Sequence, residues 1–366
     1  MEKRTIGGFA MSDYDVIHFE ALGEEAKHLE EETALAQGKD ELPKDLKYLI
    51  LPETLQEFMG KNPNAALPYL VTTKTHSVLP QDYLSGAKKS VITRSAGYDH
   101  FEHLAGTANI ASLRLYCVEA VAQTAVKFLY AAAGCLNHYT ENTRTFERNK
   151  SLSFMELNPK RTAAVFGVGR IGKKTYDLLA ANDLTVQAVD VREEELKGLY
   201  GESVHFVAKE AAIKNSDVIV NTMNLTKNPK SRFYNVNYFS KEYLLQAKPG
   251  LIFINVTRGE IAAESGLLEL FDKKIIGGLG LDIFTDENAF AKVVRGGAPD
   301  RPDHAAAKEL AERALNHSAN VYVQPHQAFN SDIAAGSKAR EAIRHIAAWY
   351  KNGKKHFDEQ LPYYKD

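Results

Sequence analysis

The chain has 366 residues, a formal net charge of −2, 44% hydrophobic residues and 25% charged residues. A length of roughly twice the ~150 residues of a typical domain predicts two domains with separate cores. The nearly neutral charge argues against nucleic acid or an anionic membrane as a partner. Acidic residues interrupt the stretch 1–20, and no apolar run approaches the ~20 residues of a membrane span, so we expect a cytoplasmic protein.

The first third of the chain alternates short apolar runs with polar or helical stretches, which predicts a small parallel α/β domain. The expected strands are residues 15–20, 47–51, 70–73, 90–94 and 110–116, with a Glu-rich helix at 24–37. The strand at 90–94 ends in a turn of small residues that includes Ala96 and Gly97. Open α/β sheets bind ligands at this end of a strand, although such a turn is also a common way to leave one.

Two long helices are predicted on either side of a second α/β domain. The first is the Ala-rich stretch 117–137, in which Cys117 and Cys135 are expected to be buried as small hydrophobic residues. The second is the amphipathic stretch 328–352. We therefore expect two doubly wound parallel-sheet, Rossmann-like domains separated by a cleft and bridged by both helices. The domain boundaries that this predicts are 1–116 plus 328–366 for one domain and 117–327 for the domain inserted in it.

A glycine-rich turn opens the second domain. The apolar run 163–166 leads without a gap into Gly167-Val168-Gly169-Arg170-Ile171-Gly172 and then into a helix. In this pattern Gly167 allows the sharp turn, Gly169 lets a pyrophosphate approach the backbone, and Gly172 lets the helix pack on the strand. The N–H groups at the start of the helix, including those of Arg170 and Ile171, would face the phosphates.

A second apolar run, residues 184–189, follows this helix and ends in Asp190, eighteen residues beyond Gly172. A carboxylate at this position binds the ribose hydroxyls of NAD and repels the additional phosphate of NADP. Strand, turn, helix, strand and acid in this order favour an NAD site over an ordinary β-α-β unit. Arg192, close by, leaves NADP as an alternative.

Further strands are expected at 218–222, 251–256, 276–281 and 321–323, and residues 288–307 are predicted to be a long loop. Three polar residues, Arg258, Glu287 and His326, follow the ends of these strands. Carboxyl ends of parallel strands converge, so the three side chains could form a carboxylate anchor, an orienting acid and a general acid/base. Each residue taken singly could equally belong to an ordinary turn or a solvated loop.

These motifs together resemble the D-isomer-specific 2-hydroxyacid dehydrogenases over about residues 91–329. The matching segments are Arg94-Ser-Ala-Gly-Tyr-Asp99, Glu119-Ala-Val-Ala122, the glycine turn with Asp190, Asn255-Val-Thr-Arg-Gly-Glu260, Gly280-Leu-Asp-Ile-Phe284 and Pro325-His326. Within the family the chain is most similar to the D-lactate dehydrogenase branch, because of Tyr116 and the segment His326-Gln-Ala-Phe329. Asn224, Glu119 and Gln123 depart from the family's usual residues.

The resemblance implies a reaction and a role for each residue. NADH would pass a hydride to a 2-oxo acid, His326 would donate a proton to the carbonyl oxygen, Glu287 would hold His326 protonated and Arg258 would bind the substrate carboxylate. The backbone N–H groups of Ala96 and Gly97 and the hydroxyl of Tyr116 would assist Arg258, and Phe329 would face the substrate side chain. Asp282 matches a family acid near the site and the cofactor.

The resemblance leaves the substrate open. Pyruvate is the first substrate to expect and a larger or aromatic 2-oxo acid the second, while glyoxylate and phosphohydroxypyruvate are further candidates. Formate oxidation is less favoured, because Glu287 stands where those relatives carry glutamine. An NADH-sensing interaction protein of the corepressor type, on the same fold, is the alternative from another functional class. The family also implies a homodimer.

Overall fold

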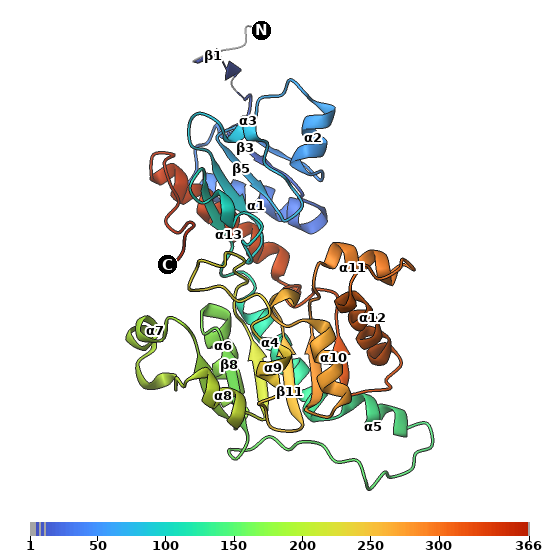
Figure 1. Ribbon diagram of the computed structural model, residues 1–366. Helices are drawn as coiled ribbons and strands as arrows, with labels where there is room; N and C mark the ends of the chain where they lie inside the picture. Colours follow the sequence, from blue (N-terminus) through green and yellow to red (C-terminus); the bar gives the residue numbers. More distant parts are fainter. Residues whose placement is uncertain (1–4, 7–8, 11, 365–366) are drawn as a thin grey trace. The chain divides into compact units, whose positions relative to one another are not determined.

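The computed structural model describes residues 5–6, 9–10 and 12–364. The chain divides into two compact units, unit 1 with residues 1–117 and 330–366 and unit 2 with residues 118–329. Each unit is built on its own parallel sheet (Figure 1). The predicted fold class of two parallel-sheet α/β domains is confirmed.

Unit 1 contains a five-stranded parallel sheet in the order β4-β3-β5-β6-β7. Side chains alternate between its two faces, as the two-residue period of a strand requires. One face of the sheet carries a row of Ile17, Val71 and Val91, which belongs to one hydrophobic core. The opposite face carries Leu70 and Ile92, which belong to a second core that α1 and α13 cover. Its elements are β1 (Thr5–Ile6), β2 (Phe9–Ala10), β3 (Val16–His18), α1 (Gly23–Gly38), β4 (Tyr48–Ile50), α2 (Leu55–Lys61), β5 (Leu70–Thr73), α3 (Gln81–Leu84), β6 (Ser90–Thr93), η1 (Glu102–Leu104), β7 (Asn109–Ser112) and α13 (Ala334–Lys351).

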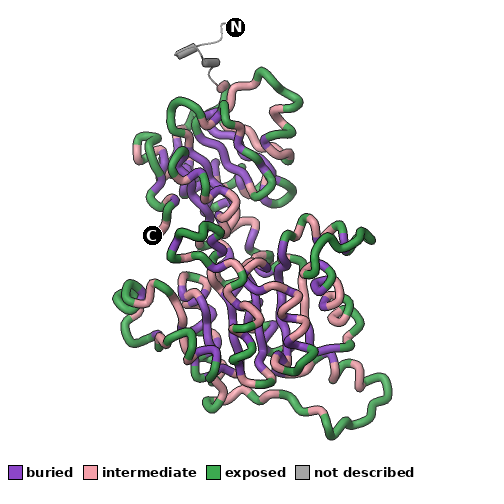
Figure 2. The backbone as a smooth tube through the Cα atoms, viewed as in Figure 1, coloured by how far each residue is buried: buried purple, intermediate pink, exposed green. Residues whose placement is uncertain are grey.

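Unit 2 contains a six-stranded parallel sheet in the order β13-β12-β11-β10-β8-β9. Most of its strand residues are buried, as expected for a sheet covered on both faces (Figure 2). The chain runs from β8 outward to β9 and then returns to β10 on the other side of β8, which is the switch point where such sheets bind ligands. Its strands are β8 (Thr162–Phe166), β9 (Thr185–Val189), β10 (Val218–Asn221), β11 (Leu251–Asn255), β12 (Ile276–Leu281) and β13 (Val321–Val323).

Helices cover the sheet of unit 2 as two layers. Helix α4 packs on α6, β11 and β12, while α8, α9, α10 and α12 share a core with the strands. The helical elements are α4 (Val118–Ala133), α5 (Leu136–Asn142), α6 (Arg170–Ala180), α7 (Glu193–Tyr200), η2 (Gly201–Ser203), α8 (Lys209–Asn215), α9 (Lys241–Leu244), η3 (Gly259–Ile261), α10 (Glu264–Asp272), α11 (Glu287–Val294) and α12 (Pro302–Leu315). Among the described residues, no helix combines the length and hydropathy that a membrane crossing requires.

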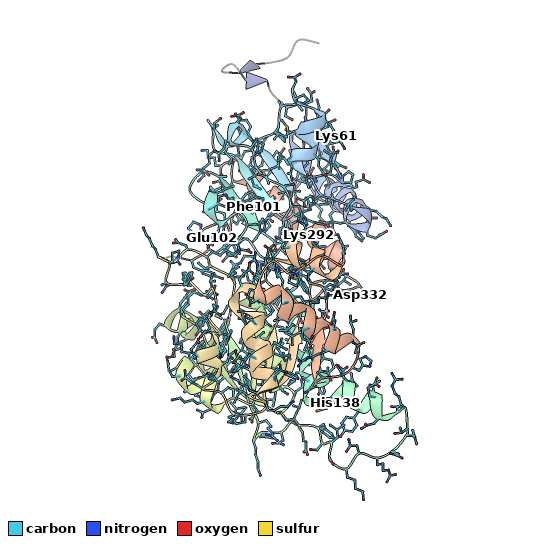
Figure 3. The ribbon with its side chains drawn as sticks, turned by 45° about the vertical axis from the view of Figure 1, so that its right-hand side comes forward. Lys61, Phe101, Glu102, His138, Lys292 and Asp332 are labelled. Atoms are coloured by element: carbon cyan, nitrogen blue, oxygen red, sulfur yellow. The ribbon has the colours of Figure 1, made fainter. Side chains whose placement is uncertain are left out.

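The predicted loop at 288–307 is wrong. Helix α11 begins at Glu287 and α12 at Pro302, so that only residues 295–301 between them are not helical. The glycine and proline residues that suggested a loop lie at the boundaries of the helices. Gly296 has a φ of +102°, which helices do not adopt, and Pro302 occupies the first position of α12, where proline is tolerated. Figure 3 labels Lys292, which lies on α11.

Several other predicted elements are shorter in the structure, including the strand expected at 15–20, which spans only Val16–His18. The strand expected at 110–116 ends at Ser112, because the N–H groups of residues 114–116 donate to the Glu341 carboxylate instead of to another strand. The helix expected at 117–137 stops at Ala133 and resumes as α5 after Cys135, whose backbone is left-handed (φ 48°). The helix expected at 328–352 begins only at Ala334. Cys117 is buried as predicted, whereas Cys135 is only half-buried, and neither forms a disulfide.

Candidate active site

The glycine-rich turn joins β8 to α6 as predicted. Gly167 has a φ of +85°, and a Cβ atom there would lie 2.7 Å from Met223 Cα, so that the turn fits closely against the end of β10. A Cβ atom at Gly172 would lie 2.0 Å from the Gly167 carbonyl oxygen. Both positions therefore require glycine, which explains two of the three glycines of the pattern.

The third glycine leaves room for a ligand. A Cβ atom at Gly169 would meet only the Arg192 guanidinium, at 3.8 Å, and Gly169 directly precedes α6. Arg170 and Ile171 are the first residues of that helix, and the N–H groups at a helix N-terminus favour the binding of anions. The space and the N–H groups fit the diphosphate of a dinucleotide.

Asp190 directly follows β9, and its side chain is only 6% exposed. Its Oδ2 accepts the N–H of Val168 at 2.7 Å, which ties the end of β9 to the glycine-rich turn. Arg192 pairs with Asp190 at 3.5 Å and with Glu195 at 3.4 Å. Arg192, the residue that kept NADP as an alternative cofactor, is thus paired with two carboxylates.

His326 and Glu287 form a pair at the carboxyl ends of β12 and β13. The Nδ1 atom of His326 lies 2.7 Å from Glu287 Oε2, and both side chains are 39% exposed. Glu287 is the first residue of α11, capped by Asp286, whose carboxylate accepts the N–H of Ala289. Phe329 lies edge-on to the His326 ring, with 6.2 Å between the ring centroids.

Asp282 holds the segment that carries His326. This carboxylate is fully buried and accepts the side chain of Gln324 at 2.6 Å and the N–H groups of Gln327 and Ala328 at 2.8 and 3.0 Å. Burial raises the pKa of Asp282 and these hydrogen bonds oppose the rise. The His326 N–H also donates to the Asp282 carbonyl oxygen at 2.6 Å, and the His326 backbone is left-handed (φ 51°). Asp282 therefore fixes the position of the histidine.

Arg258 lies beyond the end of β11. Its carbonyl oxygen accepts the side chain of Asn255 at 3.0 Å, and its guanidinium donates to the Thr257 carbonyl at 2.8 Å. Asn221, at the end of β10, donates to both Asn255 and Thr257 at 2.9 Å. These two buried asparagines, which end neighbouring strands, were not among the predicted site residues.

Gly259 brings the Arg258 turn against the Glu287 turn. A Cβ atom at Gly259 would lie 2.1 Å from the N atom of Thr285 and 2.2 Å from the carbonyl carbon of Phe284. Thr285 N in turn donates to the buried Glu264 carboxylate at 2.7 Å. The close approach of the two turns thus brings together the segments that carry Arg258 and Glu287.

The remaining predicted residues, Ala96, Gly97 and Tyr116, belong to unit 1. Ala96 and Gly97 follow β6, and the Ser95 hydroxyl fixes their turn by donating to the Gly97 carbonyl at 2.6 Å. Tyr116 is half-buried, and its N–H is bound by Glu341 at 2.8 Å.

Comparison with known proteins agrees with this geometry. Residues 126–328 match the model of the NAD binding domain of the D-isomer specific 2-hydroxyacid dehydrogenases. A D-lactate dehydrogenase of Treponema pallidum is 25% identical over 261 residues, covering 69% of this chain and 73% of that protein. A glycerate dehydrogenase of Methylorubrum extorquens is 26% identical over 208 residues, covering 54% of this chain and 62% of that protein.

Solved structures have the same fold. The D-lactate dehydrogenase of Aquifex aeolicus complexed with NAD and lactic acid superposes with a TM-score of 0.74 at 22% identity, covering 96% of this chain and 100% of that one. A D-2-hydroxyisocaproate dehydrogenase gives a TM-score of 0.72 at 17% identity, with 93% and 98% covered. The chain therefore belongs to the D-isomer specific 2-hydroxyacid dehydrogenases and is an NAD-dependent oxidoreductase of D-2-hydroxy acids.

Proposed function

We propose that this chain reduces a 2-oxo acid to the D-2-hydroxy acid, with His326 as the proton donor. The contact of 2.7 Å between His326 Nδ1 and Glu287 Oε2 carries the proposal. With Nδ1 engaged by the carboxylate, Nε2 is the nitrogen that can donate a proton to a carbonyl oxygen. NADH, when bound at the glycine-rich turn, supplies the hydride.

Arg258 is the proposed anchor for the substrate carboxylate. Its guanidinium is planar and permanently charged, so it can bind a carboxylate through two parallel hydrogen bonds. The network of Asn221 and Asn255 supports the backbone from which Arg258 extends. We propose that the N–H groups of Ala96 and Gly97 and the Tyr116 hydroxyl also donate hydrogen bonds to the substrate. Phe329 is proposed to form an apolar wall against the side chain of the substrate.

Pyruvate is the reference substrate of this proposal. Relatives named D-lactate dehydrogenase in Treponema pallidum and Streptococcus agalactiae support it, since each covers about 70% of this chain. A larger or aromatic 2-oxo acid remains the second candidate, because the D-2-hydroxyisocaproate dehydrogenase shares the fold.

Replacing the histidine tests the proposal. His326→Gln should lower kcat by ~100-fold or more, because glutamine cannot release a proton to the substrate. Glu287→Gln should lower kcat by a smaller factor, since the amide still accepts from His326 Nδ1 but carries no charge. Both rates are measured from the loss of NADH absorbance with saturating pyruvate.

His317→Gln is the matched control. His317 also has a left-handed backbone (φ 53°) and also lies near a carboxylate, with 3.4 Å between its Nδ1 and Glu141 Oε1. Its replacement should leave kcat within about twofold of the wild-type value, as expected for a group that takes no part in the reaction. A kcat of the wild-type value in His326→Gln would show that His326 is not the proton donor.

A further inference from the structure

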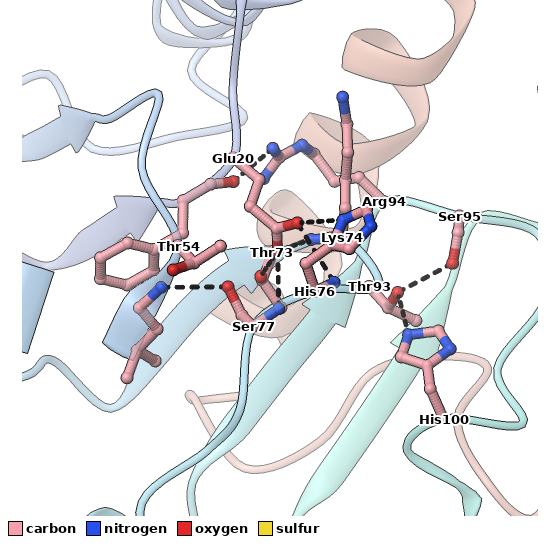
Figure 4. Close-up of polar contacts among 12 residues, drawn as sticks. Glu20, Thr54, Thr73, Lys74, His76, Ser77, Thr93, Arg94, Ser95 and His100 are labelled. Atoms are coloured by element: carbon pink, nitrogen blue, oxygen red, sulfur yellow. Dashed lines mark hydrogen bonds and ion pairs between the residues drawn. The ribbon is translucent and has the colours of Figure 1, made fainter. Parts of the chain in front are cut away.

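A buried charged side chain in unit 1 shows how this chain fixes a turn at the end of a strand. Glu20 accepts the Thr73 hydroxyl at 2.6 Å and the N–H groups of Lys74, His76 and Ser77 at 3.0 to 3.2 Å (Figure 4). Burial raises the pKa of Glu20, but these hydrogen bonds outweigh it and lower the pKa to about 2. Glu20 is therefore ionised at neutral pH and holds the turn that follows β5.

His304 is the comparable group in unit 2, and the proposed reaction does not use it. It lies in the first turn of α12, and its side chain is fully buried. Its Nε2 atom lies 2.9 Å from the Thr285 carbonyl oxygen, and its Nδ1 atom lies 2.5 Å from Asp300 Oδ1. A carbonyl oxygen only accepts hydrogen bonds, so Nε2 carries a proton.

The second ring nitrogen of His304 carries a proton as well. Desolvation raises the pKa of Asp300, but the hydrogen bond from His304 outweighs it and lowers the pKa. Asp300 is therefore ionised and accepts from Nδ1. The guanidinium of Arg301 also lies near, 3.6 Å from Asp300 Oδ1 and 3.4 Å from Asp286 Oδ2. The His304 imidazole is thus a buried cation, and each of its N–H groups has an acceptor.

Thr285, the residue that His304 binds, is held on both sides of its backbone. Its carbonyl oxygen accepts from His304, and its N–H donates to the buried Glu264 side chain at 2.7 Å. A peptide group is planar, so the direction of the carbonyl sets the plane from which the chain continues to Asp286. Asp286 has a left-handed backbone (φ 45°), a conformation that persists only where the surroundings impose it. The bond from His304 is therefore part of what holds this turn.

The turn that His304 holds leads into Glu287. Glu287 is the first residue of α11, with Oε2 2.7 Å from His326 Nδ1 and Oε1 3.4 Å from the N atom of Phe284. The His304 ring also packs near α11, with 6.1 Å between its centroid and that of the Phe290 ring. Helix α12 therefore supports the start of α11, where the Glu287 carboxylate is directed at His326 (Figure 1).

We propose that His304 is a positioning residue, which holds the Thr285 carbonyl so that the Glu287 carboxylate stays bonded to His326. The proposal rests on the proposed function, in which this carboxylate keeps His326 protonated. All the contacts that carry it lie within unit 2. Without the bond to Thr285, the start of α11 can move, the contact between Glu287 and His326 lengthens, and His326 loses its proton at a lower pH.

Two substitutions separate the two contacts of His304. His304→Gln keeps a donor at the place of Nε2 and loses the contact with Asp300, whereas His304→Asn keeps a donor at the place of Nδ1 and loses the bond to Thr285. His304→Asn should lower kcat with pyruvate by about tenfold, the effect of one charge-assisted hydrogen bond, and should change KM little because it leaves Arg258 in place. His304→Gln should keep kcat within about threefold of the wild-type value.

The proton on His326 is the direct readout. NMR follows the imidazole nitrogen shifts of His326 against pH in the NAD-saturated protein, and the signals are assigned by their absence in His326→Gln. The midpoint of this titration should lie about one pH unit lower in His304→Asn than in the wild type, because a carboxylate close to an imidazole favours its charged form. His304→Gln should keep the wild-type midpoint.

His304→Phe is a second variant without a donor, for the case that the buried site does not tolerate asparagine. It keeps a ring beside Phe290 and should lower kcat and the midpoint as His304→Asn does. Circular dichroism of each variant verifies that it is folded.

His345→Asn is the matched control. His345 is also buried and near a carboxylate, with 3.9 Å between its Nε2 and Glu341 Oε1. Its ring centroid lies 6.1 Å from that of Phe357, the same distance as between His304 and Phe290. Its replacement should leave both kcat and the titration midpoint of His326 unchanged.

The outcomes separate this inference from the proposed function. Equal titration midpoints in His304→Asn and His304→Gln would refute the positioning role, and with normal reduction of pyruvate the 2-oxo acid reductase would still stand. If no 2-oxo acid is reduced, the proposed function fails, and the midpoints alone decide. A lower midpoint in His304→Asn than in His304→Gln then supports the positioning role, because this measurement does not depend on turnover.

Discussion

Two buried carboxyl groups lie beneath the turns that carry His326 and Glu287. Asp282 accepts N–H groups from the His326 segment, and Glu264 accepts the N–H of Thr285, two residues before Glu287. Both side chains are almost completely buried. A buried carboxyl group is costly to ionise unless hydrogen bonds compensate, so these residues link the geometry of the site to pH.

Glu264 should make stability depend on pH. Burial raises its pKa to about 7 from a usual 4.5, although hydrogen bonds from Thr285 oppose the rise. Between these two values the folded protein binds a proton that the unfolded chain releases, so the free energy of unfolding falls as pH rises through this window. Glu264→Gln removes the ionisation and should stabilise the protein more at pH 8 than at pH 5, by about 1–3 kcal/mol.

Urea unfolding at pH 5 and pH 8 measures this difference. Glu269→Gln is the control on the same helix, because the Glu269 side chain is 39% exposed and pairs with Lys241 and Lys273, which lower its pKa. That replacement should not reproduce the gain at high pH. Equal changes in stability at both pH values for Glu264→Gln would show that the carboxyl group ionises normally.

Asp190 should determine the choice of cofactor. It is bonded to the Val168 N–H in the glycine-rich turn, where a carboxylate would repel the additional phosphate of NADP. Asp190→Ala should reduce the preference for NADH over NADPH by about tenfold or more, the effect of one charged contact. The ratio of kcat/KM for the two cofactors measures it.

Glu195→Ala is the control for this experiment, because it removes the other carboxylate that pairs with Arg192. Its effect on the cofactor ratio should be small, since Asp190 still occupies the end of β9. An unchanged ratio in Asp190→Ala would mean that another residue reads the ribose.

At the level of elements, the two turns after β11 and β12 depend on one glycine. Gly259→Ala would place a Cβ atom 2.1 Å from Thr285 N, and both turns would have to separate. We expect a loss of about 2–4 kcal/mol in the free energy of unfolding, as for other overpacked sites, together with a loss of kcat. Urea unfolding and the pyruvate assay measure the two effects.

Gly266→Ala is the matched control within the following helix, α10. A Cβ atom there would meet its nearest neighbour, Lys241 Cβ, at an ordinary 3.7 Å. Alanine favours a helix by up to ~1 kcal/mol over glycine, so this variant should be as stable as the wild type or more stable. Equal free energies of unfolding and equal kcat values in the two variants would show that the close approach at Gly259 is not needed for stability or activity.

At the scale of the whole molecule, the sequence predicted most strands and the order of the site residues. The strand at 70–73 has the predicted bounds, and the pair of Glu287 and His326 could be expected because both follow neighbouring strands. Short apolar runs between helical stretches are a strong signal for a buried parallel sheet. The glycine pattern was equally informative, since only glycine fits at Gly167 and Gly172.

The features that the sequence did not predict depend on contacts between distant residues. Residues 114–116 read as strand but bind Glu341, which is more than 200 residues away. The helices in 288–307 were concealed because glycine and proline mark helix ends as well as loops. Nothing in the neighbouring sequence indicated the contacts of Asn221, Glu264 and Gly259, because their partners come close only when the sheet has folded.

Hydride transfer from NADH to a 2-oxo acid is the reaction that we propose for this chain. Its most direct test follows NADH absorbance with pyruvate, phenylpyruvate, glyoxylate and oxaloacetate, with NADPH run in parallel. Rapid oxidation of NADH with at least one of these acids, slowed ~100-fold by His326→Gln, is the predicted result. Tight binding of NADH without reduction of any of the acids would contradict the proposal and favour an NADH-sensing interaction protein.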